Sequence, residues 1–277
     1  MEGFAGKVAV VTGAGSGIGQ ALAIELGRSG AHLAISDIDA EGLAATESCL
    51  KAIGAQVTSD GLNVAEREAF EVYADAVAQR FGNVHQIYNN AGIAFTGDVE
   101  ISELNDLERV FDVDYWGVVN GTKAFLPHLI ASGDGHVINI SSVFGLLGMP
   151  GQAAYCAAKF AVRGFTEALS QEMALAGHPV AVTCVHPGGI NTSLARNMTA
   201  AHGLDKQALA RDFDTKLAKL TPEQAARIIL DGVRKRKRRV LVGSDAKAID
   251  AVIRVAGTGF QRFLPKLRAR ANRPSST

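Results

Sequence analysis

The sequence predicts an α/β fold: a single domain built on one doubly wound parallel sheet of about seven strands, with helices covering both faces. Short β-branched or apolar runs alternate along the chain with longer segments of helical periodicity, which is the pattern of βαβ units. The runs are nearly continuous in apolar residues, as expected for strands buried on both faces. A glycine-rich segment, Gly13–Gly19, follows the first run directly and marks a sharp turn from strand into helix.

The alternation places each element in order. Strands are expected over residues 8–12, 32–37, 56–60, 84–89, 136–141, 180–185 and 240–243. Helices are expected over residues 22–29, 66–81, 104–130 and 155–176, another beginning at Pro222, and a last one from Asp245 that gives way to a tail. Right-handed crossovers bring the C-terminal ends of the strands to one edge, where ligands bind in open α/β sheets.

The length favours one domain. A chain of 277 residues, 47% of them hydrophobic, can build one large core, whereas two domains would each be small. We expect the domain over residues 1–243 and a C-terminal helical extension and tail over residues 244–277, with disorder at the end of the chain. Inside the domain, residues 188–220 break the alternation with small and polar residues, and we interpret them as a mobile lid over the substrate.

The charges give no global preference for a nucleic-acid partner. Lysine plus arginine equal aspartate plus glutamate at 28 each. The basic run Arg234–Arg239 and the basic end formed by Lys266, Arg268, Arg270 and Arg273 leave two interpretations: a patch for nucleic acid or a membrane surface, or a solvated helix end whose cations suit the dipole. The position of the run between a helix and the last strand favours the second. We expect no nucleic-acid partner, and membrane-surface contact is the minor alternative.

The cysteines and the apolar runs indicate the compartment. Cys49, Cys156 and Cys184 are an odd number without a paired short spacing, which argues against a disulfide framework and against a metal cluster. No run approaches the ~18 apolar residues that span a bilayer, and no basic leader precedes a long apolar stretch at the N-terminus. We therefore expect a cytoplasmic protein that holds no metal.

The glycine-rich segment has the chemistry of a phosphate-binding loop. A strand that turns sharply into a helix presents unpaired backbone N–H groups and the positive end of the helix dipole. Gly13, Gly17 and Gly19 let a pyrophosphate approach these groups without a Cβ in the way. A plain tight turn is the alternative, but the position between a strand and a helix favours phosphate binding.

Asp37 indicates which dinucleotide would bind. It ends the second predicted strand eighteen residues after Gly19, near the distance at which a carboxylate accepts hydrogen bonds from the adenosine ribose hydroxyls. A 2′-phosphate would meet like charge there, and neither Ser16 nor Ile38 is basic. The sequence therefore predicts NAD rather than NADP. The other role for such an aspartate, a helix N-cap, suits Asp39 better.

Tyr155 and Lys159 form the candidate proton-transfer site. Residues four apart on a helix share a face, so the ammonium can lie beside the phenol. Bringing a tyrosine pKa from about 10 to about 7 needs roughly 4 kcal/mol of preferential phenolate stabilisation, which the lysine and an oxidised nicotinamide ring can supply in a partly dry site. Tyr155 would then be a general acid or base, and Ser142 would hold the substrate oxygen. An isolated pair of this spacing is more often an ordinary surface pair.

The motifs and their order resemble the short-chain dehydrogenase/reductase family over roughly residues 7–243. The resemblance rests on Thr12–Gly19, Asn89–Gly92, Ser142, the Tyr155 and Lys159 pair, and Pro187–Gly188 followed by Thr192. It implies a Rossmann-like fold and a nicotinamide-dependent oxidoreductase that interconverts a secondary alcohol and a ketone. It also implies self-association into tetramers or dimers through the helices around residues 104–130 and 155–176.

The resemblance assigns the cofactor contacts residue by residue. An amide, Asn63, takes the place of the family's aspartate beside the adenine, and the segment after Pro187 resembles the one that holds the nicotinamide carboxamide. The predicted cofactor-binding residues are Gly13, Ser16, Gly17, Ile18, Gly19, Asp37, Asn63, Val64, Asn90, Ala91, Gly92, Tyr155, Lys159, Pro187, Gly188, Ile190 and Thr192. The predicted catalytic residues are Ser142, Tyr155, Lys159 and Asp114.

Asp114 departs from the family pattern. It aligns with an asparagine that helps hold a proton-relay water beside the lysine. A carboxylate near Lys159 favours the ammonium and disfavours the phenolate of Tyr155, which predicts an alkaline-shifted activity. Asp114 also supports an alternative, an NAD(H)-binding sensor or regulatory protein of the same fold with weak turnover. The intact Ser142, Tyr155 and Lys159 favour the enzyme.

Apolar residues follow both site segments, so the substrate is expected to be a hydrophobic small molecule. Core packing explains any one of these residues equally well. The candidate wall residues are Ala94, Phe95, Val143, Phe144, Leu146, Leu147 and Met149.

Overall fold

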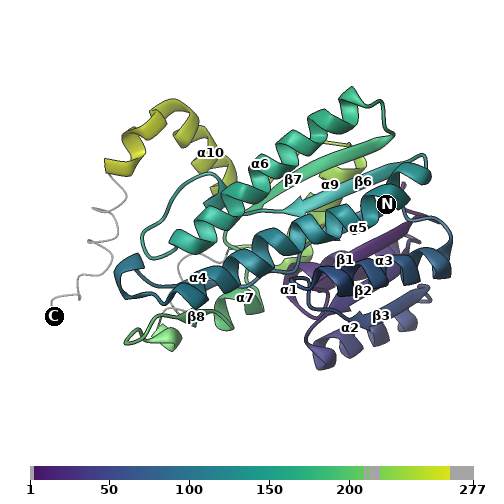
Figure 1. Cartoon of the computed structure of the whole chain (residues 1–277), viewed down its shortest axis with the longest axis horizontal. Coiled ribbons are helices and arrows are strands. Elements are labelled where there is room, and N and C mark those ends of the chain that lie inside the picture. Colours follow the sequence, from purple (N-terminus) through teal and green to yellow (C-terminus); the bar gives the residue numbers. More distant parts are fainter. Residues whose placement is uncertain (1–2, 209–210, 212–218, 263–277) are drawn as a thin grey trace.

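A computed structural model describes residues 3–208, 211 and 219–262 of the chain. Its centre is a seven-stranded sheet in which every pairing is parallel, in the order β3-β2-β1-β4-β6-β7-β9 (Figure 1). The predicted fold class is confirmed. The strands are β1 (Val8–Thr12), β2 (His32–Asp37), β3 (Val57–Gly61), β4 (Gln86–Asn89), β6 (Gly135–Ile140), β7 (Val180–Pro187) and β9 (Arg239–Val242).

Helices cover both faces of this sheet, because each presents an apolar stripe to it. One buried cluster joins the sheet to α1 (Gly17–Arg28), α2 (Ala40–Ala52) and α9 (Pro222–Arg234). A second cluster on the other face joins it to α3 (Arg67–Phe81), α5 (Gly117–Ala131) and α6 (Ala153–Leu175) (Figure 1). The strand order reverses between β1 and β4, which opens a crevice at the C-terminal edge of the strands.

Two helical features differ from the sequence-based expectation. The helix α2 was not predicted, because its Gly42, Thr46 and Ser48 weaken the helical pattern; Asp39 caps it by accepting a hydrogen bond from the Gly42 N–H at 3.2 Å. The predicted helix over residues 104–130 is α4 (Leu104–Phe111) and α5 joined by a π-helical turn, Asp112–Trp116. Such turns insert one extra residue and are frequent at functional sites.

The segment that was predicted to form a lid, residues 188–220, contains a short helix and a short strand in its described part. After β7 the chain forms α7 (Ser193–Arg196) and then β8 (Thr199–Ala200), which pairs in parallel with β5 (Phe95–Thr96). This part of the chain is therefore tied to the segment that follows β4. Residues 209–210 and 212–218 of the predicted lid lie outside the described residues.

The C-terminal extension begins as expected with α10 (Ser244–Ala256), followed by a 3₁₀ turn over Gly257–Arg262. The tail and the basic end that were predicted beyond residue 262 lie outside the described residues. None of the helices in the described ranges is long and apolar enough to cross a membrane.

Acidic side chains pair with most of the basic run Arg234–Arg239. Arg234 and Lys235 both contact Asp231, at 2.8 and 2.7 Å. Arg236 pairs with Asp134, and Arg239 pairs with Asp250 at 2.5 Å. Local neutralisation of these cations supports the interpretation of the run as a solvated helix end.

Candidate active site

Five parallel strands bring the predicted site residues to one edge of the sheet. The glycine loop follows β1, Asp37 ends β2, Asn90 follows β4, Ser142 follows β6 and Pro187 ends β7. Since the carboxyl ends of parallel strands share an edge, segments up to 175 residues apart in the chain, Thr12 to Pro187, meet there. Tyr155 and Lys159 lie in the first two turns of α6, which packs over the same region.

The glycine loop is packed too closely for any Cβ at two positions. A Cβ on Gly13 would lie 2.7 Å from the Cα of Ala91, and a Cβ on Gly19 would lie 2.1 Å from the carbonyl oxygen of Gly13. The Asn90 amide donates to the carbonyls of Thr12 and Gly13 at 2.9 and 3.2 Å. The Asn89–Gly92 segment therefore packs against the glycine loop and is hydrogen-bonded to it. Gly13 and Gly17 also have positive φ angles of 65° and 55°, which glycine adopts readily.

Thr12 belongs to this support, although we predicted no site role for it. Its hydroxyl oxygen accepts the N–H groups of Asn90 and Ala91 at 3.0 and 3.1 Å. The position of Thr12 at the start of the Thr12–Gly19 motif was the signal that could have identified it. The contact fixes the two loops relative to each other before any ligand binds.

The Asp37 carboxylate lies against the glycine loop, as the ribose assignment requires. It accepts the Gly15 N–H at 2.8 Å and the Asp39 N–H at 3.0 Å. A Cβ on Gly15 would lie 2.9 Å from the Asp37 Oδ2 atom. The side chain is half-buried and its neighbour Ile38 is exposed, so the carboxylate keeps lone pairs for hydroxyl donors at the surface of the loop.

Among the residues that the structure describes, Asn63 hydrogen-bonds only to near neighbours in the chain. Its amide donates to Glu66 at 3.0 Å and its carbonyl oxygen accepts the Ala65 N–H at 3.2 Å, so it shapes the start of α3. The next residue, Val64, is buried, and its carbonyl accepts the amide of Asn120 from α5 at 3.0 Å. Asn120 was missed by the sequence analysis because its partner lies 56 residues away.

The segment after β7 runs back to the glycine loop. Pro187 and Gly188 leave the sheet where the Asp245 carboxylate accepts the Gly189 N–H at 2.8 Å and leaves no room for a Cβ on Gly188. Ile190 and Thr192 are buried. A Cβ on Gly17 would lie 3.2 Å from the Thr192 side chain.

The hydroxyl groups of Ser16 and Ser193 are 2.7 Å apart, so the start of α7 touches the glycine loop directly. Ile18, the second residue of α1, is half-buried and packs against the cluster beneath that helix. All the predicted cofactor residues are thus grouped around the crevice except for the side chain of Asn63, which bonds locally.

Lys159 forms a buried ion pair with Asp114. Its Nζ lies 3.0 Å from the Asp114 Oδ2 atom, with side-chain exposures of 4% and 0%. The other carboxylate oxygen accepts the Ile93 N–H at 2.7 Å, and Lys159 also donates to the Ile140 carbonyl at 3.3 Å. Burial alone would lower the pKa of Lys159, but the adjacent carboxylate raises it overall. The lysine is therefore held as the ammonium.

Tyr155 lies beside this pair with its ring 5.5 Å from the Lys159 Nζ, measured to the ring centroid. Burial raises the pKa of Tyr155, and the Asp114 carboxylate adds to that effect. The Lys159 ammonium and a hydrogen bond with the Ser142 side chain act in the opposite direction without reversing it. The surrounding protein groups thus keep the phenol protonated at neutral pH.

Ser142 begins the short 3₁₀ turn Val143–Gly145, and its hydroxyl oxygen accepts the Phe144 N–H at 3.1 Å. The ring of Phe144 meets that of Tyr155 edge to face at 6.2 Å. Ser141, the preceding residue, donates its hydroxyl to the Lys159 carbonyl at 2.8 Å. The β6 end and α6 are therefore locked together on both sides of the candidate serine.

Only some of the predicted wall residues lie around the phenol. Phe95 and Phe144 share an apolar cluster with Tyr155, Val110 and Ala201. The buried Val143, Leu146 and Leu147 are outside that cluster.

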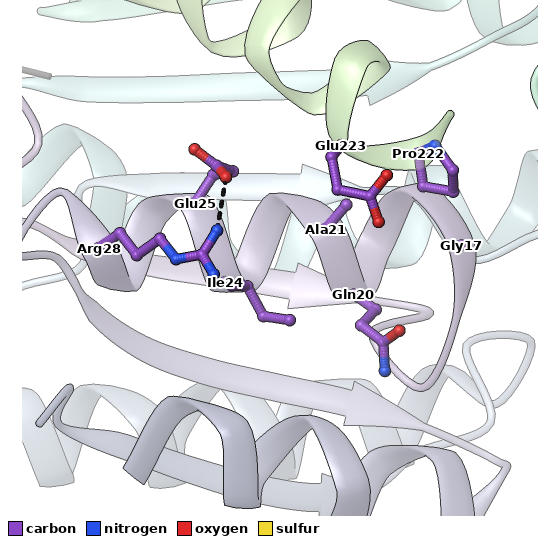
Figure 2. A pocket seen from close by; sticks show the side chains of 8 residues that line it. All are labelled: Gly17, Gln20, Ala21, Ile24, Glu25, Arg28, Pro222 and Glu223. Atoms are coloured by element: carbon purple, nitrogen blue, oxygen red, sulfur yellow. Dashed lines mark hydrogen bonds and ion pairs between the residues drawn. The ribbon is translucent and has the colours of Figure 1, made fainter. Parts of the chain in front are cut away.

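A hollow between α1 and the start of α9 shares Gly17 with the glycine loop but does not reach the candidate proton-transfer residues (Figure 2). Glu25 and Arg28 at its side pair with each other at 2.9 Å, and none of Ser142, Tyr155 and Lys159 lines it. Its lining residues are Gly17, Gln20, Ala21, Ile24, Glu25, Arg28, Pro222 and Glu223.

Comparisons with known proteins show which family the chain belongs to. The family model described as short chain dehydrogenase matches residues 7–203. SadH of Mycobacterium tuberculosis (strain H37Rv) is 62% identical over 264 residues, covering 95% of this chain and 96% of its own. Estradiol 17-beta-dehydrogenase 11 of Mus musculus is 30% identical over 272 residues, covering 98% and 86%. A short chain dehydrogenase/reductase from Burkholderia phymatum, solved in complex with NAD, is similar with a TM-score of 0.86 and 31% identity, covering 94% and 97%.

The close packing of the glycine loop predicts the effect of adding one methyl group there. Gly19→Ala must displace the Gly13 carbonyl and with it the loop, so NADH binding followed by cofactor fluorescence should weaken by about tenfold or more. Gly164→Ala is the matched control, since a Cβ at this exposed position of α6 would meet nothing within 4 Å. Equal NADH affinity in the two variants would contradict the assignment of the loop.

Proposed function

The chain belongs to the short-chain dehydrogenase family and is an NAD(P)-dependent oxidoreductase, and we propose that it interconverts a hydrophobic secondary alcohol and a ketone with NAD as the preferred cofactor. The observation that carries this proposal is the position of the Tyr155 phenol. It lies in an apolar cluster, beside Lys159 and Ser142, at the edge of the sheet that also carries the glycine loop.

The residues around the crevice fit a dinucleotide. The start of α1 follows the glycine loop directly, so its unpaired N–H groups suit a pyrophosphate, and Asp37 is placed for ribose hydroxyls. The residues from Pro187 to Thr192 would border the nicotinamide, since they connect β7 to the glycine loop. When bound, the nicotinamide accepts or supplies the hydride of the reaction.

The side chains divide the proton chemistry among them. Tyr155 gives its proton to a ketone oxygen, or takes the proton of an alcohol, as the general acid or base. Ser142 holds the same oxygen by a hydrogen bond and stabilises its developing charge. The Lys159 ammonium favours the phenolate whenever the proton leaves, while Asp114 opposes it.

The substrate class follows from what surrounds the phenol. Phe95, Val110 and Ala201 pack in its cluster, with Phe111, Tyr115 and Phe144 partly buried against it. An apolar wall favours substrates that bury hydrocarbon next to the reacting oxygen. A relative named for estradiol, which has a large apolar skeleton, supports the same class.

We also propose that the protein self-associates through the face formed by α4, the π-helical turn and α6. Leu104, Trp116 and Phe160 are exposed there by 72%, 42% and 41%, which is a large apolar exposure for one side of a molecule.

Removing the Tyr155 hydroxyl should abolish turnover and spare cofactor binding. In an assay of NAD reduction with cyclohexanol, menthol and estradiol, Tyr155→Phe should lose at least about a hundredfold in kcat, the usual contribution of a general acid or base. Tyr73→Phe is the control, because Tyr73 is a buried tyrosine of α3 outside the site. An active Tyr155→Phe enzyme would refute the mechanism. If the wild type oxidises none of these alcohols but still binds NADH, the alternative of an NAD(H)-binding sensor protein is favoured. A preference for sorbitol, a polar alcohol, would refute the proposal of a hydrophobic substrate.

The charge of Asp37 should decide between the two dinucleotides. Asp37→Ser removes the like charge that a 2′-phosphate would meet, so the ratio of NADPH to NADH affinity should rise by about tenfold, or 1.4 kcal/mol. Asp39→Ser removes the same charge two residues away and keeps a capping side chain, so its ratio should stay near that of the wild type. Tighter binding of NADPH than of NADH by the wild type would refute the preference.

Neutralising Asp114 should move the activity profile toward lower pH. Asp114→Asn removes a charge that raises the pKa of Tyr155, so the phenolate needed for alcohol oxidation forms at lower pH. The rate of NAD reduction measured from neutral to strongly alkaline pH should rise earlier in this variant. Asp112→Asn, an exposed position on the same π-helical turn, is the control. Superimposable profiles for the wild type and Asp114→Asn would reject the idea.

A further inference from the structure

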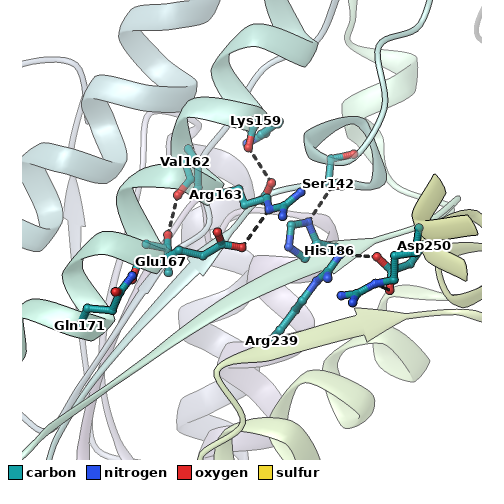
Figure 3. Close-up of polar contacts among 12 residues, drawn as sticks. Ser142, Lys159, Val162, Arg163, Glu167, Gln171, His186, Arg239 and Asp250 are labelled. Carbon is teal, nitrogen blue, oxygen red and sulfur yellow. Dashed lines mark hydrogen bonds and ion pairs between the residues drawn. The ribbon is translucent and has the colours of Figure 1, made fainter. Parts of the chain in front are cut away.

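We propose that His186 is a positioning residue that holds Ser142 in its catalytic place, an inference that rests on the proposed function of that serine. The imidazole Nδ1 atom of His186 lies 3.0 Å from the Ser142 carbonyl oxygen. His186 is the second-last residue of β7, and its side chain is fully buried, with 0% exposure. Figure 3 shows the ring between the Ser142 segment and the pair formed by Arg239 and Asp250.

A proline in β7 explains why a side chain is needed at this point. The Ser141 N–H donates to the Val185 carbonyl at 2.8 Å, so in a parallel ladder the next donor to the Ser141 carbonyl would be residue 187. Residue 187 is proline, which has no N–H. The backbone ladder between β6 and β7 therefore ends one residue before the catalytic serine. The His186 ring continues the link between the two strands by bonding to Ser142 itself.

The contact determines which ring nitrogen carries the proton. A carbonyl oxygen only accepts, so Nδ1 must be the donor, and in a neutral ring Nε2 is then an acceptor. The Nε2 atom is buried and has no hydrogen-bond partner among the described residues. The pKa of His186 is lowered to about 4, mainly by burial and also by the charges of Arg239 and Arg163. The contact with the Ser142 carbonyl acts in the opposite direction without reversing the shift. Protonation of Nε2 would leave an unpaired buried donor, so the ring is neutral and its donor faces Ser142.

Holding this carbonyl also holds the serine hydroxyl. The Ser142 carbonyl accepts the Gly145 N–H at 3.0 Å as well as the imidazole, and the hydroxyl accepts the Phe144 N–H within the same tight turn. Rotation of the Ser142 peptide would break all three contacts. His186 thus connects the turn after β6, which carries Ser142, with the segment that begins at Pro187. A displacement of about 1 Å at such a point can lower the rate by about a hundredfold.

Three variants separate positioning from general packing. His186→Leu keeps apolar volume and removes the donor, whereas His186→Asn places an amide N–H where Nδ1 was, because both atoms are bonded to Cγ. His136→Leu is the matched control: His136 is a buried histidine at the other end of β6 that also bonds across to β7, at 2.7 Å to Thr183. Each variant is measured for kcat, KM for the alcohol, NADH affinity and Tm, with menthol as the substrate probe and cyclohexanol as the second.

The expected result is a fall in kcat of about tenfold or more for His186→Leu, with NADH affinity retained. His186→Asn should recover most of that kcat. His136→Leu should lower Tm as much as His186→Leu does and leave kcat near the wild type. The proposal is overturned if His186→Leu keeps wild-type kcat, if His136→Leu lowers kcat equally, or if the asparagine restores nothing.

Ser142→Ala, measured in parallel, distinguishes this proposal from the proposed function. An active Ser142→Ala enzyme means that the role assigned to the serine fails, whereas an inactive Ser142→Ala with an active His186→Leu refutes the positioning role alone. Nitrogen NMR of the wild-type protein labelled at histidine gives a test that needs no variant to fold. A proton on Nδ1 of His186 at neutral pH supports the contact, and a proton on Nε2 overturns it.

Discussion

The buried ion pair between Lys159 and Asp114 is the interaction on which the site depends. Removing two charges from water costs several kcal/mol for each ion, and their attraction offsets this only when further hydrogen bonds satisfy both groups. The Ile93 N–H bonds to one carboxylate oxygen, the other oxygen faces Lys159, and the Ile140 carbonyl accepts a further bond from the ammonium. The pair therefore ties α6 to the π-helical turn, to the segment after β4 and to the end of β6. Loss of either partner would leave an uncompensated charge where Tyr155 must be held.

The geometry of that pair depends on a feature that the sequence did not predict. The π-helical turn interrupts the stretch from Leu104 to Ala131 and carries Asp114 inward to full burial. Gly92 lies opposite, and a Cβ there would come within 3.3 Å of the carboxylate. Hydrophobic periodicity identifies a helix over this stretch, but a single inserted residue changes which side chains face the core without altering the average pattern. The alignment of Asp114 with a family asparagine placed it near Lys159 but did not indicate its full burial or its contact with the Ile93 N–H.

The fold was more predictable than the contacts within the site. Strands buried on both faces have apolar runs that stand out, so the seven strands of the main sheet were predicted within two residues of their observed starts. The helix α2 was missed because half-exposed helices with small polar residues give a weak pattern. Thr12, Asn120 and His186 act through partners more than 40 residues away, and no local pattern encodes such contacts.

The same buried charges indicate a direction for the chemistry. A raised pKa keeps Tyr155 as a neutral phenol at neutral pH, which is the form that donates a proton to a ketone oxygen. Oxidation of an alcohol requires the phenolate, which becomes abundant only as the pH rises. An enzyme with asparagine in place of Asp114 would lack one of the three influences that raise this pKa, the other two being burial and Cys156. In the proposed mechanism the aspartate thus favours the neutral phenol, the form that serves ketone reduction, so the departure from the family pattern is compatible with turnover.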